Sequence, residues 1–481
     1  MLLLVLPGLI AAVRLVQAWL ESRSGQVLPL WLVIGAGLAF GLGQWLASCY
    51  LYLNLRVRPA QQAPDGLSVD VLVGAGEEPF AVVERALRAA CEIRYSHATY
   101  LVDEKRRRGL ADLAARLGAG YLDFRDETIS ATRGEFVALF DARHAPRPDF
   151  LERTLGLFND RRVGFVQAME AFSNVGESRL AGAAAQVSCE SDNVSALATD
   201  GCGAASLMER RAIFRRSALA SIEGQRAGSA GGLEASISLH AQGWASAYVC
   251  EPLVEGAIPA DFGAFARQQF EWSRGLIEAA FASLRGPFFR LGPAQQLCYG
   301  LRFSHGLVGA VIFLNLGFVA ASLIWSELST ENMLWPWLPL VLSLVAVRAY
   351  ALRGASGGHS PRGLEWKGAC LVVSAWPVYV LAFVTCVLRI RVPSGATSRT
   401  AGSLPSGALL LPQALMLCIL FSGVAWRVVH WAEAPMPLTL ALGVAAIGAH
   451  WILVPVWLQG RQRAAARQDR VAVESAGGVS H

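Results

Sequence analysis

The sequence predicts an integral membrane protein with a soluble α/β domain, built on a mostly parallel sheet with helices on both sides. The 481 residues are 54% hydrophobic and only 16% charged, and their mean hydropathy is +0.40. Such a composition is typical of membrane proteins that keep a soluble part. Apolar runs long enough to cross a bilayer lie near both ends of the chain, and strand-like and helix-like segments alternate between them.

Charge and cysteine content exclude two other classes of protein. The formal net charge of +5 is too modest to indicate nucleic-acid binding. The nine cysteines include no Cys-x-x-Cys spacing, and we interpret them as reduced residues of apolar cores.

Two apolar runs open the chain, Leu2–Leu20 and Pro29–Leu53. The first lacks both a preceding basic segment and a small-residue cleavage site, which favours a transmembrane helix over a cleaved signal peptide. Arg14 interrupts it, and would either extend to the membrane surface or line a polar path. Because Arg56 and Arg58 follow the second run, the positive-inside rule places the residues after it in the cytoplasm.

Alternating strands and helices are expected from Ser68 to about Ala257. Short apolar runs predict the strands, and apolar positions at helical spacing predict the helices. The expected strands are Val69–Val73, Thr99–Val102, Gly120–Asp123 and Val137–Phe140, and the expected helices are Phe80–Cys91 and Leu110–Leu117. Repeated βαβ units of this kind imply a mostly parallel sheet.

The segment 134–150 carries the first candidate site residue. Asp141 follows the strand Val137–Phe140, and in open α/β sheets ligands bind just outside the carboxyl ends of the strands. Asp149 is expected to cap the helix that follows. Taken alone, an aspartate such as Asp141 is more often a turn or cap residue than a ligand.

The C-terminal half is expected to lie in and on the membrane. Ala264–Ala282 is amphipathic, as interfacial helices are. Gly368–Leu388 is apolar, but a crossing there would place three arginines outside, so an interfacial or re-entrant segment is expected. The remaining predicted crossings are Phe303–Trp325, Leu334–Leu352, Ala408–Trp426 and Pro437–Trp457.

The segment 134–150 resembles the Asp-x-Asp region of the membrane-bound family 2 glycosyltransferases, the bacterial cellulose synthase and hyaluronan synthase group. In that group a strand ends in Asp-Ala-Asp-His and is followed by a proline and then by Asp-Phe-Leu. The order of parts also matches, and scaffold residues of the group recur, among them Gly203, Arg215–Leu219, His240 and Trp244. The resemblance implies a GT-A (Rossmann-like) glycosyltransferase domain embedded in a multi-helix transmembrane domain.

Five regions follow from this resemblance and from the hydropathy pattern. They are two transmembrane helices (1–55), a cytosolic GT-A-like domain (56–262), amphipathic interface helices (263–302), four transmembrane helices with an interfacial segment at 368–388 and a gating-like loop at 389–400 (303–458), and a basic tail expected to be disordered (459–481).

The resemblance also implies binding roles for several residues. Glu78 and Asp103 stand where the group contacts the nucleotide, and Asp141 stands where it binds a divalent metal. The second aspartate of the metal motif is replaced by Arg143, whose positive charge opposes a cation. The alternative is that Arg143 pairs with phosphate directly, because a guanidinium matches phosphate with two hydrogen bonds. 

The acceptor motif Gln-x-x-Arg-Trp reads Gln268-Gln-Phe-Glu271-Trp272. Gln268 and Trp272 are retained as candidate substrate-binding residues, while Glu271 brings a negative charge where a phosphate contact is expected. Trp272 on an amphipathic face is also read as an interface anchor.

The catalytic base of the group, the last residue of Thr-Glu-Asp, corresponds to Gly232. Glycine accepts no proton, so Glu234 is the candidate base if the protein is active, although two residues along a helix it would face away. His144 and His240 are read as packing or hydrogen-bonding residues. The run Lys105–Arg108 is read as a solvated loop.

Three functions stay open. The first is a pseudoenzyme of exopolysaccharide synthesis or export that supports an active synthase or export subunit. The second is a working processive transferase that uses a UDP-sugar, a growing polysaccharide and altered metal and base chemistry. The third is a conduit or binding protein for polysaccharide. No cofactor is expected, except Mg²⁺ or Mn²⁺ under the second hypothesis. The expected location is the inner (cell) membrane, with the transferase domain and both termini cytoplasmic, and no nucleic-acid partner is expected.

Overall fold

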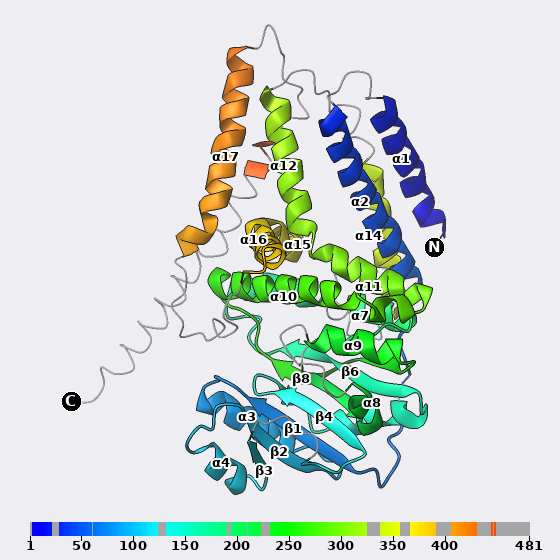
Figure 1. Ribbon diagram of the computed structural model, residues 1–481, viewed down its shortest axis with the longest axis vertical. Helices are drawn as coiled ribbons and strands as arrows, with labels where there is room; N and C mark the ends of the chain where they lie inside the picture. The colour runs from blue at the N-terminus through cyan, green and yellow to red at the C-terminus, as the bar shows by residue number, and fades with distance from the viewer. Residues whose placement is uncertain are drawn as a thin grey trace, which may run out of the picture.

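The computed structural model describes residues 2–21, 28–59, 61–123, 131–189, 194–208, 210–222, 231–324, 337–355, 366–390, 406–430, 444–445 and 447–448. Apolar helices stand on one side of a layer of flat-lying helices, and an α/β domain lies on the other side (Figure 1).

A mixed sheet forms the centre of the α/β domain. Among the described residues it has eight strands in the order β3-β2-β1-β4-β7-β6-β8-β5. The strands are β1 Val69–Ala75, β2 Ala98–Asp103, β3 Gly120–Asp123, β4 Phe136–Asp141, β5 Ala145–Pro146, β6 Val163–Phe172, β7 Arg211–Arg215 and β8 Ala245–Gly256. The predicted parallel pairing is confirmed for β1 with β2 and β4, and for β2 with β3. β7 runs antiparallel to both β4 and β6, a feature that the sequence pattern did not predict.

Helices cover both faces of this sheet. The described helices of this domain are α3 Phe80–Cys91, α4 Leu110–Arg116, α5 Phe150–Thr154, the 3₁₀ helix η2 Leu155–Asn159, α6 Arg179–Ser188, α7 Ser195–Gly201, α8 Arg216–Ser221 and α9 Gly231–Ala241. Of these, α6 packs away from the sheet, against α15. β1 shows the two cores: Val71 and Val73 pack into one, and Leu72 packs into the other. Burial on both faces explains why the parallel strands read as continuous apolar runs. The predicted bounds of α3 and β3 are confirmed to the residue.

The prediction that Asp149 caps the helix after β5 is wrong. α5 does begin after Asp149, but its side chain makes no capping hydrogen bond. The carboxylate instead accepts hydrogen bonds from Nε and Nη2 of Arg147, at 3.1 and 3.2 Å. A forked guanidinium two residues away is a stronger donor than a backbone N–H, so it takes the carboxylate from the helix end.

Apolar helices form the part of the molecule that lies away from the sheet. They are α1 Leu2–Glu21, α2 Leu28–Leu53, α12 Val308–Ile324, α14 Trp337–Ala355 and α17 Ser406–Val429. By length and composition, α1, α2 and α17 could each cross a membrane, and the described chain offers up to five spans if each of two bent helix pairs counts as one. Most of the predicted crossing Pro437–Trp457, most of the gating-like loop and the whole tail 459–481 lie outside the described residues.

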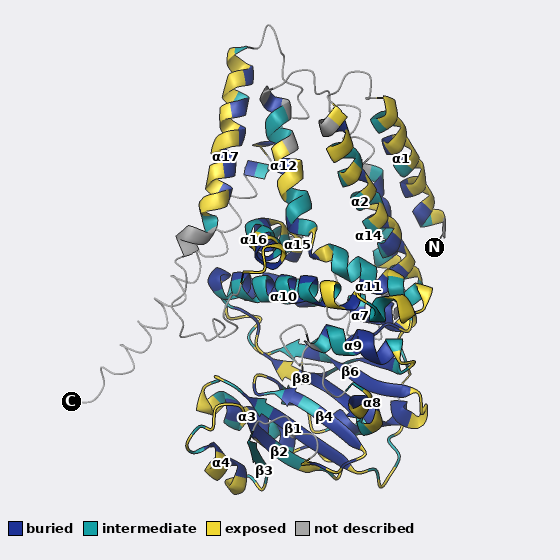
Figure 2. Cartoon of the chain, viewed as in Figure 1, coloured by how far each residue is buried: buried dark blue, intermediate teal, exposed yellow. Residues whose placement is uncertain are grey.

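A layer of short and flat-lying helices joins the two parts. It comprises α10 Phe262–Ser283, the 3₁₀ helix η4 Pro287–Arg290, α11 Pro293–His305, α15 Trp366–Ser374 and α16 Trp376–Val387. α15 and α16 occupy the segment expected to be interfacial, and the chain bends by 47° between them. The hydroxyl of Tyr379 donates to Gln269 of α10 at 3.0 Å, and the Gly368 N–H donates to Gln186 of α6 at 3.0 Å. Residues of α10 are mostly buried or half-buried, whereas the apolar helices expose much of their surface (Figure 2).

Candidate functional site

The carboxyl ends of β1, β2 and β4 meet at one edge of the sheet. Gly74 of β1 is in register with Asp141 of β4, and Ala75 is in register with Asp103 of β2. The Ala142 N–H donates to the Gly74 carbonyl at 2.8 Å, which ties the turns together beyond the strands. The sheet therefore gathers the candidate residues of three separate segments at the edge where parallel strands bind ligands.

The carboxylate of Asp141 forms an ion pair with Arg143 of the same turn. Its Oδ1 accepts hydrogen bonds from the Arg143 N–H at 3.0 Å and from Nε at 3.1 Å, and Nη2 lies 3.4 Å from Oδ2. Burial raises the pKa of Asp141. The Arg143 guanidinium and, to a lesser degree, His144 lower it, and their combined effect is larger, so the pKa lies below its ordinary value. The carboxylate is thus ionised, and its charge is balanced within the chain.

α10 brings a carboxylate toward this turn. Burial raises the pKa of Glu271, and the guanidinium groups of Arg143 and Arg267 act against that shift. Glu271 therefore lies within electrostatic range of Arg143. Gln268 and Trp272 are half-buried on the neighbouring turn of the same helix, at the spacing that places side chains side by side. Asp141, Arg143 and Glu271 form one group of charges, which we call the Asp141 cluster, and Gln268 and Trp272 lie next to Glu271 on α10.

Asp103 is fully buried and its carboxylate is used to close a turn. It accepts hydrogen bonds from the N–H groups of Lys105 and Arg107 at 3.0 and 2.7 Å, and from the Tyr121 hydroxyl at 3.1 Å. Glu78 is half-buried and accepts the Gly76 N–H at 2.8 Å. Glu78 and Asp103, the two residues predicted to contact a nucleotide, both lie at the expected edge of the sheet. Each carboxylate also accepts hydrogen bonds from backbone N–H groups of its own loop.

Two arginines at this edge were missed as site residues. The Arg210 side chain lies beside β1, because a Cβ added to Gly74 would be 3.1 Å from Nη1 of Arg210. The backbone carbonyl of Arg210 accepts a hydrogen bond from the Asp141 N–H at 3.0 Å. The β4–β7 pairing brings it there from about 70 residues away in the sequence, so no local pattern could indicate it. Arg107 belongs to the run read as a solvated loop, but its side chain folds inward and donates to the Glu78 carbonyl.

A buried charged network lies next to the Asp141 turn. His144, Glu170 and Arg211 are 2%, 7% and 1% exposed. His144 Nε2 lies 3.4 Å from Glu170 Oε1, and Arg211 forms an ion pair with the same carboxylate. A Cβ on Gly256 would be 1.8 Å from Glu170 Oε1, so a larger residue there would clash with the network. His144 is therefore a packing and hydrogen-bonding residue, as predicted.

Glu234 lies beside a different part of α10. Burial raises its pKa, and Glu278 raises it further. Glu278 is seven residues beyond Glu271, about 10 Å along the helix, and is held by Arg274 at 2.7 Å. The structure thus places Glu234 next to Glu278, and no described contact joins it to the Asp141 cluster.

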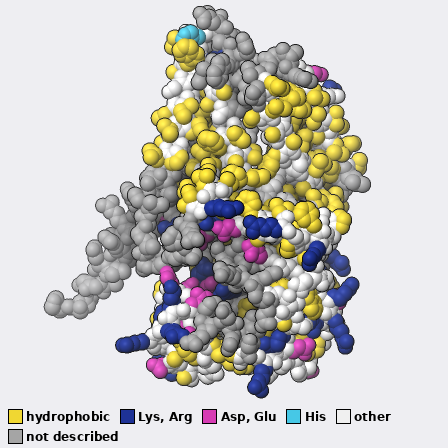
Figure 3. Space-filling view, viewed as in Figure 1, with side chains coloured by type: hydrophobic (Ala, Val, Ile, Leu, Met, Phe, Trp, Pro, Cys, Tyr) yellow, Lys and Arg dark blue, Asp and Glu magenta, His cyan; other side chains and the backbone are white. Residues whose placement is uncertain are grey.

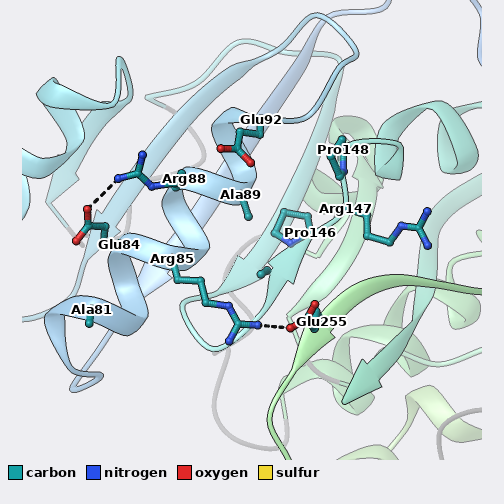
Figure 4. A pocket seen from close by; sticks show the side chains of 11 residues that line it. Ala81, Glu84, Arg85, Arg88, Ala89, Glu92, Pro146, Arg147, Pro148 and Glu255 are labelled. Atoms are coloured by element: carbon teal, nitrogen blue, oxygen red, sulfur yellow. Dashed lines mark hydrogen bonds and ion pairs between the residues drawn. The ribbon is translucent and has the colours of Figure 1, made fainter. Parts of the chain in front are cut away.

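A groove of about 530 Å³ runs between α3 and β5, adjacent to the loops that carry Glu78 and Asp141. Arg85 of α3 pairs with Glu255 of β8 across it at 2.8 Å, and Arg88 pairs with Glu84 at 3.0 Å (Figure 4). Its three arginines are matched by three glutamates. The groove therefore has no excess positive charge for a diphosphate, and it lies beside the Asp141 cluster.

The oxygen ligands at the Asp141 cluster do not fit a divalent cation. Such cations require several oxygen ligands, but both Asp141 oxygens face Arg143. Across the part of the chain that the structure describes, no three His, Cys, Asp or Glu residues group closely enough to hold a metal ion.

Comparison with known proteins identifies the domain that carries these residues. The family model described as glycosyltransferase like family 2 matches residues 80–275, from the start of α3 into α10. The chain carries a family 2 glycosyltransferase-like domain. This glycosyltransferase-like domain includes Asp103, Asp141, Arg143, Glu234, Gln268 and Trp272.

Curated relatives of the glycosyltransferase-like domain are cellulose synthases. The chain is 26% identical over 293 residues to putative cellulose synthase 2 of Komagataeibacter xylinus, covering 53% of this chain and 19% of the relative. It is 25% identical over 259 residues to the UDP-forming cellulose synthase catalytic subunit of Xanthomonas axonopodis pathovar citri, covering 48% and 34%. The chain thus spans between about a fifth and a third of the length of these relatives.

A solved structure shares the fold. A mannosyltransferase from Pyrobaculum calidifontis, in complex with GDP-mannose and Mn²⁺, superposes with a TM-score of 0.54 at 16% identity, covering 75% of this chain and 99% of that one. The predicted GT-A fold, with apolar helices attached, is confirmed by this likeness and by the family match.

Proposed function

We propose that this protein is a membrane-embedded, cellulose synthase-like glycosyltransferase homologue that has lost its own transfer activity and supports a partner synthase or export subunit in exopolysaccharide production. The observation that carries the proposal is the Asp141–Arg143 pair, which fills the position expected to bind a metal. A relative described as a catalytic subunit supports the idea of a multi-subunit assembly.

Electrostatics at this turn opposes metal binding. Arg143 contacts Asp141 through two guanidinium nitrogens. Two like unit charges about 4 Å apart repel by roughly 4 kcal/mol at an effective dielectric constant of 20. A divalent cation at Asp141 would therefore have to displace Arg143 and would gain a single carboxylate in exchange.

Two other positions argue against turnover. Gly232, at the expected position of the catalytic base, has no proton acceptor, and Glu234 lies beside Glu278. Glu271 adds a negative charge near the position where a departing diphosphate would need positive charge. General base catalysis typically contributes about 10²–10⁴-fold, and electrostatic stabilisation of a developing charge about 10²–10³-fold for each donor. Losing both would leave no measurable polymer synthesis.

A second candidate function is an active transferase that neutralises the diphosphate with arginines. Arg143 is 58% exposed at its side chain, and Arg107 and Arg210 lie at the same edge of the sheet. Guanidinium groups bind phosphate through paired hydrogen bonds, so these residues would hold a UDP-sugar without a metal. Gln268 and Trp272 would then contact the acceptor, and Glu234, whose pKa is raised, would be the candidate base.

The test is sugar incorporation by the full chain alone in lipid nanodiscs, with radiolabelled UDP-sugars and with or without Mn²⁺. We expect incorporation at background level for the wild type and for Arg143→Asp, since restoring one metal ligand restores neither the base nor a diphosphate contact. A cellulose synthase assayed in parallel is the positive control.

The matched variants are Trp272→Ala and Glu234→Gln. Incorporation by the wild type that Trp272→Ala abolishes would contradict the proposed function and establish the second candidate. Loss of that incorporation in Glu234→Gln would then identify the base.

A further inference from the structure

α1 carries two polar residues on a face that no described element covers. Its opposite face packs against α2 and α14 through buried residues that include Val5, Ala11 and Leu15. Arg14 and Gln17 are exposed, and together with Ile10 and Val13 they form an open strip of the α1 surface. The spacing of the four residues places them on one stripe of the helix. We call this stripe the Arg14 face.

The position of Arg14 along α1 makes it difficult to reach water. It lies seven residues from Glu21, about 10 Å along the axis, and twelve residues from Leu2, about 18 Å along it. Side chains on a helix lean toward its N-terminus, so Arg14 leans away from the nearer end. The farther end is beyond the reach of an arginine side chain. A guanidinium at this depth in hydrocarbon needs a polar partner.

The described part of this chain does not supply that partner. α2, α12, α14 and α17 contain no aspartate or glutamate. Glu21 is the nearest carboxylate on the same face, but no ion pair joins it to Arg14 in the described structure. A second copy related by a two-fold axis along this face would set Arg14 against Arg14, and like charges repel. The charge therefore favours a different chain.

We propose that the Arg14 face binds a transmembrane helix of another protein, one that carries a carboxylate at the depth of Arg14. Gln17, one turn away, supplies a second hydrogen-bonding group, and Ile10 and Val13 supply the apolar contacts beside it. Polar side chains join membrane helices in this way because hydrocarbon offers them no other partners. The inference does not depend on whether the glycosyltransferase-like domain is active.

The test uses synthetic transmembrane peptides as probes. The full chain, with a fluorophore on an N-terminal tag, is reconstituted in phosphatidylcholine vesicles with acceptor-labelled leucine-rich peptides. One peptide carries a glutamate at the depth of Arg14 and the other carries a glutamine there. Energy transfer should report about tenfold tighter association of the glutamate peptide, the size expected of one strong intramembrane polar contact.

Variants separate a role of Arg14 from misfolding. Arg14→Leu should remove the preference between the peptides, and Arg14→Lys should retain most of it. Leu415→Ala, at an exposed position of α17, should leave it unchanged. Equal association of both peptides with the wild type would overturn the proposal. Loss of the preference when phosphatidylglycerol is added would also overturn it, since a lipid phosphate would then occupy Arg14.

Discussion

Asp141 and Arg143 are two residues apart on one turn, and their pairing changes what the turn can bind. An aspartate at the end of β4 is ready to accept a cation only while its oxygens face solvent. Here both oxygens face a guanidinium. A positive charge beside the carboxylate suits an anionic ligand better than a metal ion, which is why the two candidate functions differ in their need for metal.

His240 provides a residue-level prediction on pH. It is 4% exposed, and its ring nitrogens contact the Ser246 hydroxyl at 2.9 Å and the Tyr299 hydroxyl at 2.8 Å. Burial lowers the pKa of His240 from 6.5 to about 4. Between these values the unfolded chain binds a proton that the folded chain does not. The free energy of unfolding should therefore fall as the pH falls from 6.5 to 4, by up to about 3 kcal/mol.

The measurement compares thermal unfolding of the full chain in detergent at pH 7 and pH 4.5, for the wild type and for His240→Gln. Glutamine does not titrate, so the variant should lose less stability on acidification than the wild type, although it starts from a lower value. Equal losses in the two proteins would show that His240 is not buried as a neutral ring.

At this scale the sequence predicts positions better than partners. Asp141 was expected at the carboxyl end of a strand, because a short apolar run before it predicts that strand. Its relation to Arg210 could not be expected, since it arises from the antiparallel pairing of β4 with β7. Asp149 failed as a cap for a different reason, since the Arg147 guanidinium competes with the backbone N–H groups of the helix for its carboxylate.

Among the structural elements, the connection from α2 into the glycosyltransferase-like domain includes an ion pair to a buried carboxylate. Arg58 donates to Asp200 of α7 from Nε at 2.7 Å and from Nη2 at 3.0 Å, and Asp200 is 2% exposed. The Tyr248 N–H of β8 also donates to this carboxylate, at 3.1 Å. One carboxylate therefore joins the segment after α2, the helix α7 and the strand β8.

Arg58→Ala should destabilise the domain by about 3 kcal/mol, because it leaves a buried carboxylate without its cation. The matched control is Arg162→Ala, which removes a pair with Asp160 whose side chains are 81% and 45% exposed. Because solvent screens such a pair, this variant should leave the free energy of unfolding almost unchanged. Thermal unfolding in detergent measures both. Similar small losses in the two variants would mean that Asp200 is adequately held by Tyr248 and the backbone around it.

Strand and helix bounds were predicted well where the apolar pattern was regular. The bounds of α3 and β3 agree to the residue. The sequence pattern did not indicate that β7 would insert between β4 and β6 in the opposite direction, since its five residues carry no sign of their partners. Long-range pairing of this kind depends on which edges the rest of the sheet leaves available.

In the molecule as a whole, hydropathy and charge predict the layered arrangement. The apolar helices, the flat-lying layer and the α/β domain follow one another as the composition along the chain indicates (Figure 1). Charged side chains gather below the apolar belt and are sparse within it (Figure 3). The predicted number of crossings stays a prediction, because the last predicted crossing lies mostly outside the described residues. The cytoplasmic side of the domain also stays a prediction.

Titration calorimetry with UDP on the full chain in nanodiscs, with Mn²⁺ and then with a chelator, tests the central claim most directly. Arg143 occupies Asp141, so we expect no binding that depends on the metal. Arg143→Asp is the matched variant for the metal site. Micromolar affinity of the wild type that the chelator abolishes would show that Asp141 holds a cation despite Arg143, and would contradict the account. Affinity that the chelator leaves unchanged would instead assign diphosphate binding to the arginines.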